Sequence, residues 1–249
     1  KDYCEILYKN MNNRFPVENK IPGFLVIDTP GHESFTNLRS RGSSLCDIAI
    51  LVVDIMHGLE QQTLESIELL RQKKCPFIIA LNKIDRIYGW KAKEYNNTRD
   101  ALESQKGNCM SEFGDRLNKA VLAFAEQGFN ACVYWENDDI NDFVSFVPTS
   151  AITGEGLPDL ITYLIYQCQE RIPQQLTEKA DRFECTVLEV KVIEGLGTTI
   201  DVVLVDGLLK VQDTIILQGF NGAIVTQIRA LLTPHPMKEM RVKAEYIHH

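Results

Sequence analysis

Three short runs of apolar residues, each followed directly by a polar loop, constrain the fold of this chain more than any other feature. The runs are 24–27 (FLVI), 48–53 (IAILVV) and 77–81 (FIIAL), and they lead into Asp28, Asp54 and Asn82. A strand that is apolar on both faces is typical of a parallel sheet with helices on both sides. A sheet with one face exposed to solvent instead has strands in which apolar and polar residues alternate. We therefore expect a buried parallel sheet.

The alternation of strand and helix patterns continues to about residue 175. The further expected elements are a helix at 61–74, a loop and the start of a helix within 91–108, a helix ending near Gly128, a strand at 143–147 and a helix at 157–168. Strands that alternate with helices predict a doubly wound α/β domain with a mostly parallel sheet over residues 1–175.

A second domain is expected at 181–249, after a polar stretch around Pro173 that predicts a domain boundary. Strand-like segments follow at 183–193, 198–205, 214–217 and 223–230, and the turns between them are rich in glycine. Short strands with Gly-rich turns are typical of an antiparallel β-barrel. Because so few strands leave an open edge, we expect the barrel to be incomplete within this sequence.

Composition excludes several classes of protein. Apolar residues make up 45% of the chain, which excludes a chain that is disordered overall, and no apolar run approaches the roughly 20 residues of a membrane helix. The net charge of −8 argues against a broadly basic surface but leaves a local nucleic-acid contact open. The seven cysteines include no CxxC pair, which argues against a disulfide framework or a zinc site and favours a cytoplasmic protein.

Three polar loops, at 28–32, 82–85 and 149–151, are candidates for a functional site, and the first of them is 28–32 (DTPGH). A carboxylate such as Asp28 at a strand end can hold Mg²⁺ through a water molecule, because Mg²⁺ takes oxygen ligands and keeps several of its waters. Gly31 lets a backbone N–H approach a phosphate oxygen without a side chain intervening. Asp, Pro and Gly are also common in plain turns, so this loop alone does not distinguish a site from a turn.

The second polar loop, 82–85 (NKID), offers groups that match a guanine base. The Asp85 carboxylate can accept hydrogen bonds from N1–H and the exocyclic amine of guanine, whereas adenine has an acceptor at N1 and no amine at that edge. The aliphatic stem of Lys83 can lie along the purine, and Asn82 can tie neighbouring loops. A solvated polar turn could carry the same residues, and that alternative stays open for this loop alone.

The third loop, 149–151 (TSA), follows the strand expected at 143–147 and can direct backbone N–H groups at the guanine O6. Small residues also make ordinary turns, so the combination of the three loops carries more weight than any one of them. All three follow predicted strands, and ligands bind at the carboxyl ends of the strands in open α/β sheets. Together the loops predict a guanine-nucleotide site.

These three loops resemble the third, fourth and fifth G motifs of the translational GTPases. The chain is similar in particular to the initiation factor 5B family of eukaryotes and archaea, the relatives of bacterial initiation factor two. The residues that carry this resemblance are 21–23 (IPG), 31–39 (GHESFTNLR), 41–47 (RGSSLCD), 54–60 (DIMHGLE) and 197–201 (GTTID). The likeness covers nearly the whole chain, and it implies a P-loop-NTPase-like G domain followed by a β-barrel domain.

The resemblance also implies roles for individual residues. His32 would be the catalytic residue that positions the attacking water near the γ-phosphate, Asp28 would bind Mg²⁺ through water, and 33–45 would be a switch helix. The residues implied to bind GTP or GDP are Asp28, Gly31, Asn82, Lys83, Asp85, Ser150, Ala151 and Ile152. The implied partners are both ribosomal subunits, initiator tRNA and other initiation factors, for a cytoplasmic monomer without a membrane contact.

A phosphate loop of the form GxxxxGK(S/T), which normally cradles the nucleotide phosphates, does not occur in these residues, and neither does the first switch. We therefore expect a fragment whose G domain lacks both, and a chain that alone binds guanine nucleotide poorly and hydrolyses it hardly at all. The function expected of the parent protein is GTP hydrolysis on the ribosome during subunit joining. The alternatives are an inactive module of the same fold that docks on the ribosome, and an elongation-type relative that delivers aminoacyl-tRNA.

Overall fold

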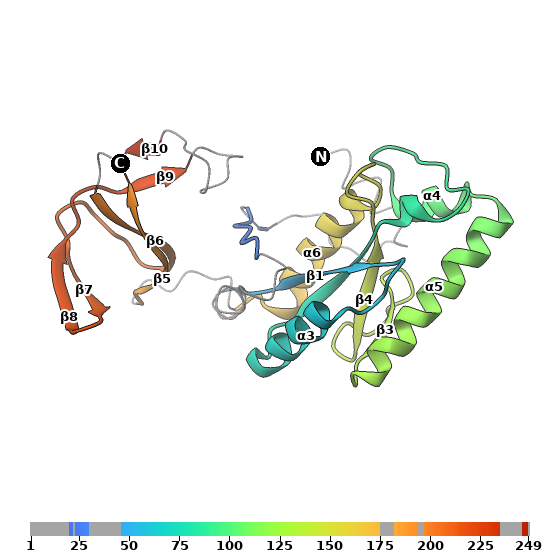
Figure 1. Ribbon diagram of the computed structural model, residues 1–249, viewed down its shortest axis with the longest axis horizontal. Helices are drawn as coiled ribbons and strands as arrows, with labels where there is room; N and C mark the ends of the chain where they lie inside the picture. Colours follow the sequence, from blue (N-terminus) through green and yellow to red (C-terminus); the bar gives the residue numbers. More distant parts are fainter. Residues whose placement is uncertain are drawn as a thin grey trace. The chain divides into compact units, whose positions relative to one another are not determined.

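The computed structural model of the chain describes residues 20–21, 23–29, 46–174, 182–193, 197–234 and 246–248. They belong to two compact units, Lys1–Thr177 and Glu178–His249, and each unit is considered by itself (Figure 1). The predictions for Gly31, His32 and the switch helix at 33–45 lie outside the described residues.

A four-stranded parallel sheet forms the centre of the first unit. Its strands are β1 (Ala49–Asp54), β2 (Phe77–Asn82), β3 (Asn130–Val133) and β4 (Phe143–Pro148), arranged in the order β1-β2-β4-β3. Every neighbouring pair in this sheet is parallel. The predicted parallel α/β fold is confirmed.

Helices cover both faces of the sheet (Figure 1). Among the described residues of this unit, the helices are α3 (Gln61–Lys73), the short α4 (Thr98–Glu103), α5 (Gly107–Glu126) and α6 (Leu157–Arg171), and the 3₁₀ turn η2 (Ile84–Arg86) follows β2. Residues of α3 and α5 pack on one face of the sheet, and residues of α6 pack on the other. Pro158 lies in the first turn of α6, where a missing backbone N–H costs no helical hydrogen bond.

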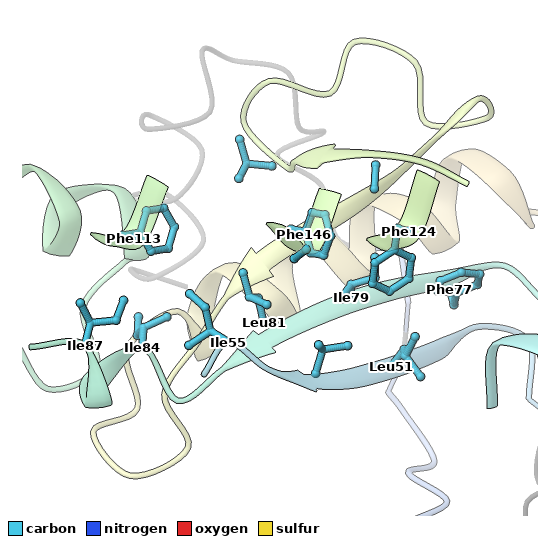
Figure 2. Packing of buried hydrophobic residues seen from close by; sticks show 14 of the residues in the cluster. Leu51, Ile55, Phe77, Ile79, Leu81, Ile84, Ile87, Phe113, Phe124 and Phe146 are labelled. Carbon is cyan, nitrogen blue, oxygen red and sulfur yellow. The ribbon is translucent and has the colours of Figure 1, made fainter. Parts of the chain in front are cut away.

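Strand β2 shows why the central strands are apolar without alternation. Ile79 and Leu81 belong to the core formed with α3 and α5 (Figure 2). Ile78 and Ala80 belong to the core formed with α6. Successive side chains of a strand point to opposite faces, so both sets are buried and both must be apolar. The five residues Phe77–Leu81 are all buried, and this two-sided burial holds the carboxyl end of the strand in place.

The strand predicted at 24–27 is wrong. Residues 23–29 form neither a helix nor a strand, and the side chains of Phe24, Leu25 and Val26 are 45%, 72% and 84% exposed. An extended segment needs backbone hydrogen bonds to a neighbouring strand, and none of the strands that the structure describes pairs with this one. The apolar pattern alone therefore did not suffice to predict a strand.

The second unit is built from antiparallel strands. They are β5 (Glu184–Ile193), β6 (Gly197–Asp206), β7 (Thr214–Gly219), β8 (Gly222–Gln227), β9 (Leu232–Pro234) and β10 (Tyr246–His248). In the part of this unit that the structure describes, β5 pairs with β6, β7 with β8 and β9 with β10, as three separate two-stranded sheets. The four predicted strands correspond to β5–β8, although the last was expected to run to residue 230, and β9 and β10 were not predicted. The incomplete antiparallel barrel stays a prediction. Among the residues described, there is no helix with the length and apolar character needed to cross a membrane.

Candidate functional site

The second and third polar loops lie side by side at the carboxyl edge of the sheet, because β2 and β4 are parallel neighbours. The backbone N–H of Thr149 donates to the carbonyl of Leu81 at 2.9 Å, and the N–H of Ile84 donates to the carbonyl of Thr149 at 3.3 Å. These bonds extend the pairing of the two strands into the loops. The structure thus brings together two motifs that are far apart in the sequence.

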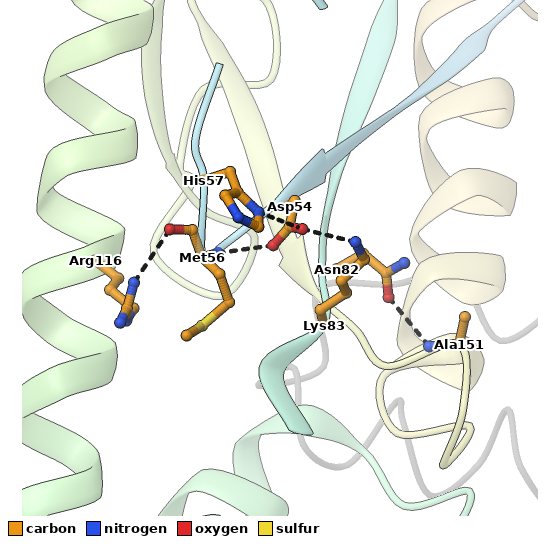
Figure 3. Close-up of polar contacts among 7 residues, drawn as sticks. All are labelled: Asp54, Met56, His57, Asn82, Lys83, Arg116 and Ala151. Atoms are coloured by element: carbon orange, nitrogen blue, oxygen red, sulfur yellow. Dashed lines mark hydrogen bonds and ion pairs between the residues drawn. The ribbon is translucent and has the colours of Figure 1, made fainter. Parts of the chain in front are cut away.

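Two further contacts join the polar groups that were predicted to recognise guanine. The hydroxyl of Ser150 donates to Oδ1 of Asp85 at 2.6 Å, and the backbone N–H of Ala151 donates to Oδ1 of Asn82 at 3.1 Å (Figure 3 shows the second contact). This bond holds the Asp85 carboxylate through one of its two oxygens. The side chain is half-buried and therefore still partly accessible. The two loops therefore present a fixed carboxylate and a backbone donor at one edge of the sheet.

The three backbone amides of the third loop are not equivalent. The N–H groups of Thr149 and Ser150 donate to the backbone carbonyls of Leu81 and Glu155, both at 2.9 Å. The N–H of Ala151 donates instead to a side chain, which can rotate away without breaking the backbone structure. Of these three amides, Ala151 is therefore the one whose N–H partner is a side chain, and the contact to guanine O6 stays a prediction. The side chain of the neighbouring Ile152 is 79% exposed.

Asp54, at the end of β1, is a residue that the sequence pattern marked as a strand end but not as part of the site. Its Oδ2 accepts a hydrogen bond from Nζ of Lys83 at 2.7 Å and lies 2.9 Å from Nδ1 of His57 (Figure 3). Burial raises the pKa of Asp54, but the hydrogen bonds from Lys83 and His57 outweigh it and bring the pKa to about 2. The charged carboxylate of Asp54 therefore anchors the ammonium group of Lys83. The backbone of Lys83 is left-handed, with φ 70°.

The segment that follows Asp54 is also held by α5. The Arg116 guanidinium donates to the carbonyl of Met56 at 3.4 Å (Figure 3). A cavity of about 400 Å³ lies here, lined by 54–59 together with residues of α3 and α5, among them Lys119. Its lining includes no residue of the second or third polar loop, so the cavity is distinct from the predicted guanine site.

Of the first polar loop, the structure describes only Asp28 and Thr29. Asp28 is exposed and makes no hydrogen bond or ion pair with any residue that the structure describes. In those described ranges no group of three or more His, Cys, Asp or Glu side chains could hold a metal ion. The Mg²⁺ role of Asp28 stays a prediction, as do the roles of Gly31 and His32.

Comparison with known proteins gives a family match over most of the chain. Residues 9–170 match the family described as the elongation factor Tu GTP binding domain. The chain is 59% identical over 229 residues to eukaryotic translation initiation factor 5B of Saccharomyces cerevisiae, and 56% identical over 241 residues to that of Schizosaccharomyces pombe. These alignments cover 92% and 97% of this chain but 23% and 22% of the relatives, so the chain spans less than a quarter of their length.

A solved structure gives the same result for the fold. The GDP-bound aIF5B from Aeropyrum pernix superimposes with a TM-score of 0.87 at 40% sequence identity, covering 99% of this chain and 42% of that one. The predicted resemblance is confirmed by the family match and by these relatives together. The chain belongs to the elongation factor Tu GTP-binding domain family, the translational GTPases, and its relatives there include the initiation factors 5B.

Proposed function

We propose that this chain is the nucleotide-binding part of a translation initiation factor that binds and hydrolyses GTP on the ribosome during subunit joining. The observation that carries the proposal is the contact of the second and third loops, in which Asp85 meets Ser150 and Asn82 meets Ala151. A carboxylate held by a hydroxyl, beside a backbone donor, is complementary to the N1–H, amine and O6 edge of guanine. The relatives named initiation factor 5B support the assignment to translation initiation.

Residues in and beside the two loops have distinct roles in this proposal. Asp85 accepts hydrogen bonds from N1–H and the exocyclic amine of the base. The N–H of Ala151, released from Asn82, donates to O6. The stem of Lys83 covers one face of the purine while its ammonium group stays near Asp54. Ile152 and Ser150 complete the loop that borders the base.

The roles proposed at the phosphates rest on the residue types at 28–32 and on the resemblance. Asp28 holds Mg²⁺ through water, Gly31 offers a backbone donor to the γ-phosphate, and His32 orients the attacking water. The magnesium ion, when bound, neutralises developing charge on the phosphates. Because the sequence contains no phosphate loop, we propose that these residues alone bind nucleotide weakly and hydrolyse it hardly at all.

The domains and partners are proposed in the same way. Residues 1–175 form the G domain without its phosphate loop and first switch, and 181–249 form part of an antiparallel β-barrel. The factor acts as a monomer in the cytoplasm, without a membrane contact, on both ribosomal subunits and with initiator tRNA and other initiation factors. A second candidate is an inactive module that docks on the ribosome, and the missing GxxxxGK(S/T) sequence in these residues favours it.

Turnover of GTP with and without ribosomal subunits separates the two candidates. The protein to use is an extended chain, in which a segment carrying the phosphate loop and first switch precedes residue 1. We expect ribosomal subunits to stimulate its turnover, and His32→Ala to lower turnover about 100-fold while GTP affinity stays nearly unchanged, because His32 orients water rather than nucleotide. An extended chain that binds subunits and GTP but shows no turnover would support the docking module instead.

A further inference from the structure

Glu155 is a fully buried carboxylate in the loop that follows Ala151, with 0% of its surface exposed. Oε1 accepts a hydrogen bond from the backbone N–H of Lys93 at 2.8 Å, and Oε2 accepts from Nε1 of Trp90 at 3.1 Å and from the hydroxyl of Thr153 at 2.7 Å. A carboxylate is costly to bury unless donors satisfy it, and here both oxygens have donors. Glu155 therefore joins the segment after the second loop to the segment after the third.

A continuous chain of hydrogen bonds leads from Glu155 to Asp85. The Thr153 hydroxyl donates to Glu155, and the backbone N–H of Thr153 donates to Oγ of Ser150 at 3.2 Å. The Ser150 hydroxyl in turn donates to Oδ1 of Asp85 at 2.6 Å. The Ser150 oxygen thus accepts the hydrogen bond from Thr153, and its single hydroxyl proton is donated to Asp85.

The backbone of the same loop is closely fitted against the sheet. Ser150 donates to the carbonyl of Glu155, and Gly154 donates to the carbonyl of Ser150, both at 2.9 Å. Gly156 has φ 72°, and a Cβ atom there would lie 2.1 Å from the carbonyl oxygen of Pro148. With so little free space, a change at Glu155 is transmitted to Ser150 rather than absorbed by the loop.

We propose that Glu155 is a positioning residue for guanine recognition, which sets the orientation of the Asp85 carboxylate through Thr153 and Ser150. The inference rests on the proposed function, because it assigns Asp85 to the base. Glu155 is buried and does not touch the nucleotide itself. Its loss lets the Asp85 carboxylate turn, which weakens the hydrogen bond to the exocyclic amine more than the contacts to sugar and phosphate.

The affinities of GDP and inosine diphosphate, measured on the extended chain with ADP as a reference, test this role. Inosine lacks the exocyclic amine, so the ratio of the two affinities reports the Asp85–amine hydrogen bond. We expect the wild type to prefer GDP about tenfold or more. Glu155→Gln, which presents an N–H to the donors around it, and Thr153→Val should each reduce this preference at least about threefold. Thr153→Ser keeps the hydroxyl and should match the wild type.

The outcomes separate the inference from the proposed function. Variants that keep the wild-type ratio of GDP to inosine diphosphate affinity, whether or not both affinities fall, would show that Glu155 has only a structural role. That result would overturn the inference. A wild type that prefers GDP over neither inosine diphosphate nor ADP would contradict the proposed function, and the inference with it. If Glu155→Gln does not fold, as judged by thermal unfolding, the pair Thr153→Val and Thr153→Ser decides the result.

Discussion

Replacing Asp85 by asparagine in the extended chain is expected to lower GDP affinity about 100-fold and to raise the affinity for xanthosine diphosphate above that for GDP. An asparagine side chain offers one acceptor and one donor, so its N–H would face the N–H of the guanine amine. Xanthine carries an oxygen at that position and accepts the new N–H, which restores the pair. The Ser150 hydroxyl can still donate to the remaining side-chain oxygen.

Competition titrations with a fluorescent nucleotide measure both effects. Asp142→Asn is the matched control, because Asp142 is an exposed acid that directly precedes β4, at the end of the strand opposite the third loop. That control should bind both diphosphates as the wild type does. An unchanged GDP affinity after Asp85→Asn, or a loss without any gain for xanthosine diphosphate, would remove Asp85 from the base-recognition site.

The second large effect concerns the dependence of stability on pH. Asp159 is fully buried at the start of α6, where its carboxylate accepts hydrogen bonds from the N–H of Thr98 at 2.7 Å and the hydroxyl of Tyr134 at 2.9 Å. Burial raises the pKa of Asp159 to about 6, and these hydrogen bonds only partly oppose the shift. Because the pKa is higher in the folded state than in the unfolded state, the protonated side chain favours folding, and this contribution is lost as the pH rises from about 4 through 6.

Asp159→Asn cannot ionise and should abolish this contribution. Relative to the variant, the wild type is expected to lose about 2 kcal/mol of unfolding free energy between pH 4 and pH 7, since the pKa differs by about two between the two states and the unfolded carboxyl is already partly ionised at pH 4. Urea unfolding of both proteins at pH 4, 5.5 and 7 measures the difference, with Asp142→Asn again as the control. A free-energy difference that stays constant across this range would show that Asp159 does not titrate in the folded state between those pH values.

The strands of the first unit show what an apolar pattern can and cannot predict. The run at 77–81 was predicted within one residue of β2, because burial on both faces leaves an unbroken apolar sequence. The run at 24–27 has the same pattern but forms no strand, because strand formation also depends on a paired neighbour. An apolar pattern indicates that a segment has to be buried, but it does not indicate which strand would pair with that segment.

Short elements were missed for a different reason. Helix α4 and strand β3 have six and four residues, too few for a periodic pattern to stand out. Helix α4 did leave a local signal, because the Asn97 side chain caps it by accepting the N–H of Asp100. That signal was available within the polar stretch at 91–108, which was predicted only as a loop and the start of a helix.

The candidate site was predictable only in part. The adjacency of the second and third loops followed from the parallel sheet, because both loops end neighbouring strands. The ion pair of Lys83 with Asp54 and the buried position of Glu155 were not predictable, because both depend on side chains from separate segments meeting in space. An acidic residue between two glycines, as at 154–156, is most simply interpreted as solvated, and only the fold shows it to be buried.

Guanine-selective binding is the property on which the proposed function depends most directly. A titration with fluorescent GDP, and with ADP as competitor, should be made on the 249-residue chain and on the extended chain. We expect the extended chain to prefer GDP over ADP by about 100-fold or more, and the shorter chain to bind weakly, because the base contacts come from Asp85 and Ala151 while the phosphate contacts come from the added segment. Equal affinity of the extended chain for GDP and ADP, or no binding of either, would contradict a guanine site at these loops.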